Sequence, residues 1–104
     1  MVDTIALACT GATRQILAWR AVRPVVVEAV ELQDADSPCL ATILVSPKGS
    51  ASFGACLNQG TTVLPSGQIQ WSGRLTLGPD EEVRGYVDGG VAADRLFLTV
   101  KVRG

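Results

Sequence analysis

The sequence predicts an all-β domain: an antiparallel β-sandwich of the jelly-roll or Greek-key type with little or no helix. Short stretches alternate apolar and polar residues, and this period of two points side chains to opposite faces of a strand. Turn residues separate the stretches about every ten residues, and no amphipathic helical pattern runs between them. The 104 residues are predicted to form one domain, 1–104, in which residues 1–24 are either an N-terminal arm or extra strands.

The central pattern runs through Gln68–Leu77, where Ile69, Trp71, Leu75 and Leu77 fall on alternate positions and are predicted to face the core. Gly78–Asp80 interrupts the run, because proline lacks an amide donor and glycine and aspartate favour turns. The alternation then resumes over Val83–Val87. These two strands and their turn predict a β-meander.

The other predicted strands are shorter or less regular. In Val25–Leu32, Val26, Val30 and Leu32 share one face, and apolar residues also lie on the other face. Thr13–Pro24 fits a helical turn as well as a strand, and the strand is favoured because no capping box begins a helix there. The remaining strands are predicted at Thr4–Cys9, Cys39–Ser46, Ala51–Leu57, Thr61–Leu64 and Arg95–Arg103, with Asp88–Asp94 as a surface turn before the last.

Composition limits the classes of partner. The net charge is −1 and the isoelectric point about 5.2, which argues against nucleic acid, whose binding depends on Lys and Arg neutralising phosphates. The N-terminus does not resemble a signal peptide, and no apolar run is long enough for a membrane span. A hydrophobic content of 47% predicts apolar surface left for a partner, although many alanines and valines give the same value without such a surface.

The sequence gives little support for catalysis or for metal binding. The chain has no histidine, which excludes Ser-His and Cys-His catalysis and a histidine-containing zinc site. Cys9, Cys39 and Cys56 lie far apart among apolar or neutral neighbours, so they are predicted to be buried free thiols of low reactivity.

Two acidic pairs lie in turn-like sequence. Asp34 with Asp36, and Glu81 with Glu82, are predicted to be solvated surface charges, and neither has the spacing of a calcium-binding EF-hand loop. The prediction is a protein that is not an enzyme and has no catalytic, metal-binding or cofactor-binding residues.

One charge pattern suggests contacts between copies of the chain. Arginines cluster between residues 14 and 23 without an acid, and acids cluster between residues 28 and 36 without a base. Complementary patches of this kind can orient neighbouring subunits, although solvated charges of arbitrary sign give the same pattern. The candidate intersubunit contacts are Arg14, Trp19, Arg20, Arg23, Glu28 and Glu31.

Residues 25–104 resemble small β-sandwich virion proteins of tailed bacteriophages. The resemblance is carried by residues 61–87, where a turn leads into a strand with an aromatic residue and glycine and then an acidic corner. An alternating valine strand follows at residues 98–102, and residues 25–32 and 40–45 match the paired central strands of that pattern.

The resemblance implies a structural part of a virion, made in the host cytoplasm. The favoured version is a capsid decoration (cement) or head-fibre protein, a trimer or other homo-oligomer, that binds other virion subunits; the resemblance implies no catalytic residues. The alternative is a carbohydrate- or receptor-binding module of a phage tail, with Trp19, Trp71 and Tyr86 as its candidate sugar-stacking residues. An exposed Trp19 beside Tyr86 would favour the alternative.

Overall fold

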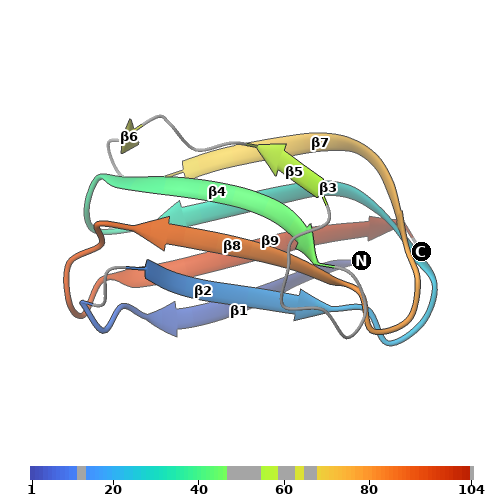
Figure 1. Cartoon of the computed structure of the whole chain (residues 1–104), viewed down its shortest axis with the longest axis horizontal. Helices are drawn as coiled ribbons and strands as arrows, with labels where there is room; N and C mark the ends of the chain where they lie inside the picture. Colours follow the sequence, from blue (N-terminus) through green and yellow to red (C-terminus); the bar gives the residue numbers. More distant parts are fainter. Residues whose placement is uncertain (12–13, 47–54, 59–62, 65–67, 104) are drawn as a thin grey trace.

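The computed structural model describes residues 1–11, 14–46, 55–58, 63–64 and 68–103, which form two antiparallel sheets packed face to face (Figure 1). The β9 sheet has the strand order β1-β9-β3-β7, and the β8 sheet has the order β2-β8-β4-β5, with β6 also paired to β4. The strands are β1 (Val2–Ala8), β2 (Arg14–Arg20), β3 (Val25–Asp34), β4 (Cys39–Ser46), β5 (Ala55–Asn58), β6 (Val63–Leu64), β7 (Gln68–Leu77), β8 (Glu82–Asp88) and β9 (Arg95–Arg103).

The predicted all-β sandwich is confirmed. No helix long and apolar enough to cross a membrane is present among the described residues.

The predicted meander is wrong, because β7 and β8 lie in different sheets. β7 pairs with β3, whereas β8 pairs with β2 and β4. The backbone of the connecting turn bonds to the neighbouring β2–β3 connection: the amide of Asp80 donates to the carbonyl of Ala21 (2.7 Å), and the amide of Ala21 donates to the carbonyl of Glu81 (2.9 Å). Two connections therefore cross between the sheets side by side. An alternating pattern identifies the inward face of a strand but not the sheet that contains it.

The predicted pairing of residues 25–32 with residues 40–45 is also wrong. These segments form β3 and β4, which lie in opposite sheets and face each other across the core. The parity of β3 also changes within the strand, so Val26 does not share a face with Val30 and Leu32. The pairing register shifts between Val27 and Ala29, so Val27 is buried with Val30 and Leu32, and Val26 is not. A β-bulge of this type adds one residue and changes which residues point inward.

The N-terminal residues supply one edge strand to each sheet, β1 and β2. In β2 the inward residues are Leu17 and Trp19, both buried in the core. The indole Nε1 of Trp19 donates a hydrogen bond to Oδ2 of Asp3 in β1 (2.8 Å). This bond connects the edges of the two sheets and satisfies the polar atom of a buried aromatic side chain.

We predict that Gly85→Ala destabilises the fold because of the close packing between the sheets. Gly85 lies in β8, and a Cβ at this position would lie 2.7 Å from Cδ1 of Leu32 in β3. The expected loss in free energy of unfolding is about 1–3 kcal/mol, as for other overpacked cores, and urea unfolding followed by circular dichroism measures it. Because Leu32→Val removes the obstructing atoms, the double variant should lose less stability than the sum of the two single variants. Additive losses would contradict this explanation.

Candidate functional site

The outer face of the β8 sheet brings charged and aromatic side chains together. Val83, Gly85 and Val87 of β8 point into the core, so the alternate residues of the strand point outward. The pairing register places β2 residues beside them in rows. We call the resulting surface the Tyr86 face; its residues are Arg14, Ile16, Ala18 and Arg20 of β2 and Glu82, Arg84, Tyr86 and Asp88 of β8.

Tyr86 lies at the centre of one row, beside Ile16, whose side chain is 48% exposed. The guanidinium carbon of Arg14 lies 4.7 Å from the centroid of the Tyr86 ring, a distance typical of cation–π contact. Arg14 also forms a two-bond ion pair with Asp88, with Nε to Oδ1 at 2.8 Å and a terminal nitrogen to Oδ2 at 3.2 Å. The hydrogen bond and charge of Asp88 raise the pKa of Arg14. Tyr86 is thus held in a fixed, partly exposed position.

A second charge group lies at the other end of the same face. Glu82 accepts hydrogen bonds from Arg84 (2.9 Å) and from Arg20 (3.3 Å). The bond from Arg84 to Glu82 raises the pKa of Arg84, and a bond between Arg84 and Tyr86 adds to this effect. Three guanidinium groups and two carboxylates therefore lie on the same face as Tyr86, and two of the guanidinium groups, those of Arg14 and Arg84, contact it.

The arginine and tryptophan candidates differ in where the structure places them. Arg14 and Arg20 lie on the Tyr86 face and bind acids of their own chain. Arg23 is exposed in the connection between β2 and β3. Trp19 is only 7% exposed, so its side chain is not available for contact with another copy or with a sugar. Trp71 is partly buried against the core.

The acidic candidates belong to the opposite sheet. Glu28 is at the bulge of β3, with its Oε1 3.9 Å from Nε of Arg103, and Glu31 accepts a hydrogen bond from Gln70 (3.0 Å). Glu31 also lines a shallow hollow of about 210 Å³ on the β9 sheet. This volume is below the roughly 300–1,000 Å³ of most small-molecule pockets. The basic and acidic patches of one chain therefore face different directions.

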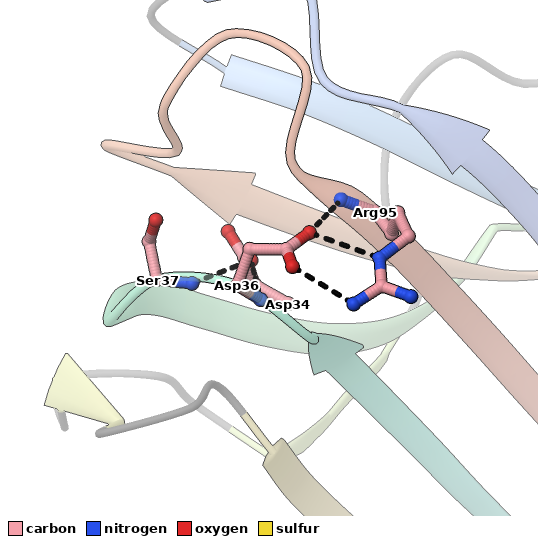
Figure 2. A network of polar contacts seen from close by, with 4 residues as sticks. All are labelled: Asp34, Asp36, Ser37 and Arg95. Carbon is pink, nitrogen blue, oxygen red and sulfur yellow. Dashed lines mark hydrogen bonds and ion pairs between the residues drawn. The ribbon is translucent and has the colours of Figure 1, made fainter.

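Three aspartates meet where β3 ends and β9 begins; we call Asp34, Asp36 and Asp94 the aspartate corner. Asp34 is fully buried, and its Oδ1 accepts hydrogen bonds from the amides of Asp36 (2.9 Å) and Ser37 (3.0 Å) (Figure 2). The prediction that Asp34 is a solvated turn residue is wrong. β3 extends as far as Asp34, which occupies an inward-facing position of the strand. Its carboxylate therefore lies beneath the turn and not on the surface of the turn.

Asp36 faces outward and binds Arg95, as Figure 2 shows. Its carboxylate accepts bonds from the amide (2.7 Å), Nε (3.2 Å) and a terminal nitrogen (2.9 Å) of Arg95. These bonds lower the pKa of Asp36 and raise the pKa of Arg95. The turn after β3 is thereby fixed to the first residue of β9.

Asp94 is 6% exposed, although the connection between β8 and β9 was predicted to be a surface turn. Its Oδ2 accepts a hydrogen bond from the amide of Val91 (3.1 Å), and its carbonyl accepts one from the amide of Cys9 (2.8 Å). Burial raises the pKa of Asp34. Burial opposes ionisation of Asp94 too, but the hydrogen bond from Ser37, the neighbouring Asp34 carboxyl group and the hydrogen bond from the Val91 amide outweigh it and lower the pKa of Asp94. One of two adjacent carboxyl groups thus favours the proton and the other the charge.

Comparison with known proteins identifies the fold and no family. No protein-family model and no curated protein sequence matches this chain. The structure of CpGH89CBM32-6 produced by Clostridium perfringens matches with a TM-score of 0.66 and 6% identity, over 92% of this chain and 75% of that chain. The Podospora anserina GH26-CBM35 beta-(1,4)-mannanase matches with a TM-score of 0.52 and 8% identity, over 99% of this chain and 28% of that chain. Both names contain a carbohydrate-binding-module label, and identities this low establish only a shared β-sandwich.

The sequence pattern did not identify several residues of these two sites. Arg84 and Asp88 could have been found from the outward parity of β8, because they alternate with Val83 and Val87. Asp94 could not have been found in this way, since it lies near Asp34 only because two strands that are far apart in the chain pair with each other. The buried free thiols were predicted correctly for Cys9 and Cys39, while the side chain of Cys56 lies outside the described residues.

We predict that Cys39 and Cys9 do not react with Ellman's reagent in the folded protein. Burial, followed by the charges of Asp34 and Asp94, raises the pKa of the Cys39 thiol to about 11, so only about a thousandth of it is thiolate at about pH 8. Cys56→Ser removes the third cysteine. This variant should show no reactive thiol in buffer and two in guanidinium chloride. Rapid labelling of a thiol in the folded variant would contradict the packing described.

Proposed function

We propose that this protein is a non-enzymatic carbohydrate-binding module that binds a glycan on its Tyr86 face. The observation that carries the proposal is the shared fold with the CBM32 structure, which extends over 92% of this chain and most of that one. The likeness gives no information on individual residues. The location of the site therefore has to be argued from the chemistry of the surface itself.

Sugars present both apolar C–H faces and many hydroxyl groups, so a binding surface needs an aromatic ring beside charged hydrogen-bonding groups. Of the three aromatic residues predicted for sugar stacking, Tyr86 alone lies on an outer face, because Trp19 is buried and Trp71 packs on the core. The Arg14–Asp88 pair provides donors and acceptors next to the ring. Its two-bond geometry is fixed before a ligand arrives, which reduces the entropy lost on binding.

The absence of catalysis is part of this proposal. The chain contains no histidine, and the only carboxylates of the Tyr86 face, Glu82 and Asp88, are both ion-paired with arginine. An ion pair with arginine favours the charged carboxylate and so disfavours its use as a general acid. Binding without bond cleavage is the function that this surface supports.

A second function, self-assembly within a virion, is supported by the exposed edge of the β9 sheet. The edge strand β1 contains neither proline nor lysine, the residues that commonly protect such edges. Met1 and Val2 are more than half exposed, and Leu7 is 37% exposed. An edge of this kind can pair with another copy of the chain, as expected of a decoration or head-fibre protein.

We predict that a glycan array detects binding by the wild-type protein and that Tyr86→Ala reduces the affinity about tenfold or more, equivalent to about 1.4 kcal/mol. Tyr86→Phe keeps the ring and should retain most of the affinity. Phe97→Ala is the matched control, because Phe97 is a half-buried aromatic residue of the opposite sheet. Isothermal titration calorimetry with the best array ligand measures each affinity. Absence of binding on the array, or equal loss in the Phe97 variant, would contradict the proposal.

We predict that assembly, if it uses β1, is disrupted by Ala6→Lys. Ala6 is exposed on the edge strand, and lysine at an edge prevents pairing with another strand. Ser72→Lys is the matched control, since Ser72 is exposed on β7 at the other edge of the same sheet. Size-exclusion chromatography with light scattering should show an oligomer for wild type and Ser72→Lys, and a monomer for Ala6→Lys. A wild-type monomer at high concentration would exclude this mode of assembly.

A further inference from the structure

We propose that the aspartate corner binds a calcium ion. This inference is independent of the glycan proposal, because none of the three aspartates lies on the Tyr86 face. One carboxylate oxygen from each of Asp34, Asp36 and Asp94 can be chosen so that all lie within 4.8 Å of one another. Calcium binds oxygen at 2.3–2.6 Å, so opposite ligands lie about 4.6–5.2 Å apart. The three oxygens therefore fit within one calcium coordination shell.

The second observation is an unsatisfied buried oxygen. Oδ1 of Asp34 accepts two amide hydrogen bonds, but Oδ2 of the same carboxylate is fully buried and has no hydrogen-bond partner. It is the one such side-chain atom among the described residues. A buried, unpaired carboxylate oxygen is costly, and native structures normally satisfy such an atom. A cation bound between Asp34 and Asp94 would satisfy it.

The local backbone fixes the positions of the ligands. Gly90 borders Oδ2 of Asp34, since a Cβ at Gly90 would lie 3.6 Å from it. The connection between β8 and β9 has Ala93 in the left-handed region (φ 74°), held by a hydrogen bond from its amide to the carbonyl of Cys9 (2.7 Å). Asp94 is thus presented to Asp34 by a defined backbone conformation.

The charge balance favours a divalent ion. Arg95 is engaged with Asp36 through three hydrogen bonds and compensates that carboxylate. The described ion pairs include neither Asp34 nor Asp94, so two carboxyl groups lie buried side by side without a basic partner. Two like charges at short range repel each other unless a cation or a proton lies between them. Irregular carboxylate ligands suit calcium better than magnesium, which requires near-ideal octahedral geometry at 2.0–2.1 Å.

The test uses the full chain, freed of metal with a chelator and titrated with calcium chloride at neutral pH. Isothermal titration calorimetry should give one calcium per chain, and the melting temperature should rise by about 10 °C at a calcium concentration a hundredfold above Kd. Magnesium should bind more weakly. If the two carboxylates share a proton instead, calcium produces neither heat nor a thermal shift, and the proposal is overturned.

Variants distinguish calcium binding at the aspartate corner from calcium binding to other acidic residues of the surface. Asp94→Asn keeps an oxygen to accept the Val91 amide but removes the charge, and it should lower the calcium affinity at least tenfold. Asp34→Asn should do the same, and if it does not fold, the wild-type and Asp94 measurements still decide. Glu28→Gln is the control, since Glu28 lies at the bulge of β3, away from the corner. Equal calcium binding by Asp94→Asn and wild type, or by magnesium and calcium, would overturn the assignment.

Discussion

The contact of Leu32 with the backbone of Gly85 determines how closely the two sheets approach. Leu32 is fully buried, and its side chain occupies the space that a Cβ of residue 85 would need. Such interdigitation of inward side chains with small facing residues gives a β-sandwich its dense core. Since the inward positions of β8 are occupied by Val83, Gly85 and Val87, the polar residues of this strand lie on the outer face. The core therefore dictates where the Tyr86 face is.

The sequence allowed the faces of the strands to be predicted better than their partners. The alternation in β7, β8 and β9 identified Leu77, Val83 and Leu98 as core residues, because burial on one side imposes a period of two. It did not distinguish a hairpin from a crossing between sheets, since both place apolar residues inward. The bulge at Glu28 shifted the inward face of β3 for a related reason: an inserted residue leaves no compositional signal.

The same limits apply to the candidate sites. The outward position of Tyr86 follows from the parity of β8, and the free thiols of Cys9 and Cys39 follow from their apolar neighbours. The burial of Asp34 does not follow from sequence, because a turn rich in acids normally lies in solvent. Strand pairing between β3 and β9 brings the turn after one strand to the start of the other, and this non-local pairing assembles the aspartate corner.

β8 connects the two proposed sites. Its last residue, Asp88, holds Arg14 against Tyr86, and the chain then passes through Gly89 and Gly90 to the aspartate corner. Gly89 adopts φ +78°, a conformation that favours glycine, and the connection ends at Asp94 in the aspartate corner. A cation held by Asp94 would restrict that end. Asp88 itself pairs with Arg14 of β2 and with Leu40 of β4, so the β8 sheet fixes the contact between Arg14 and Tyr86 whether or not the aspartate corner holds a cation.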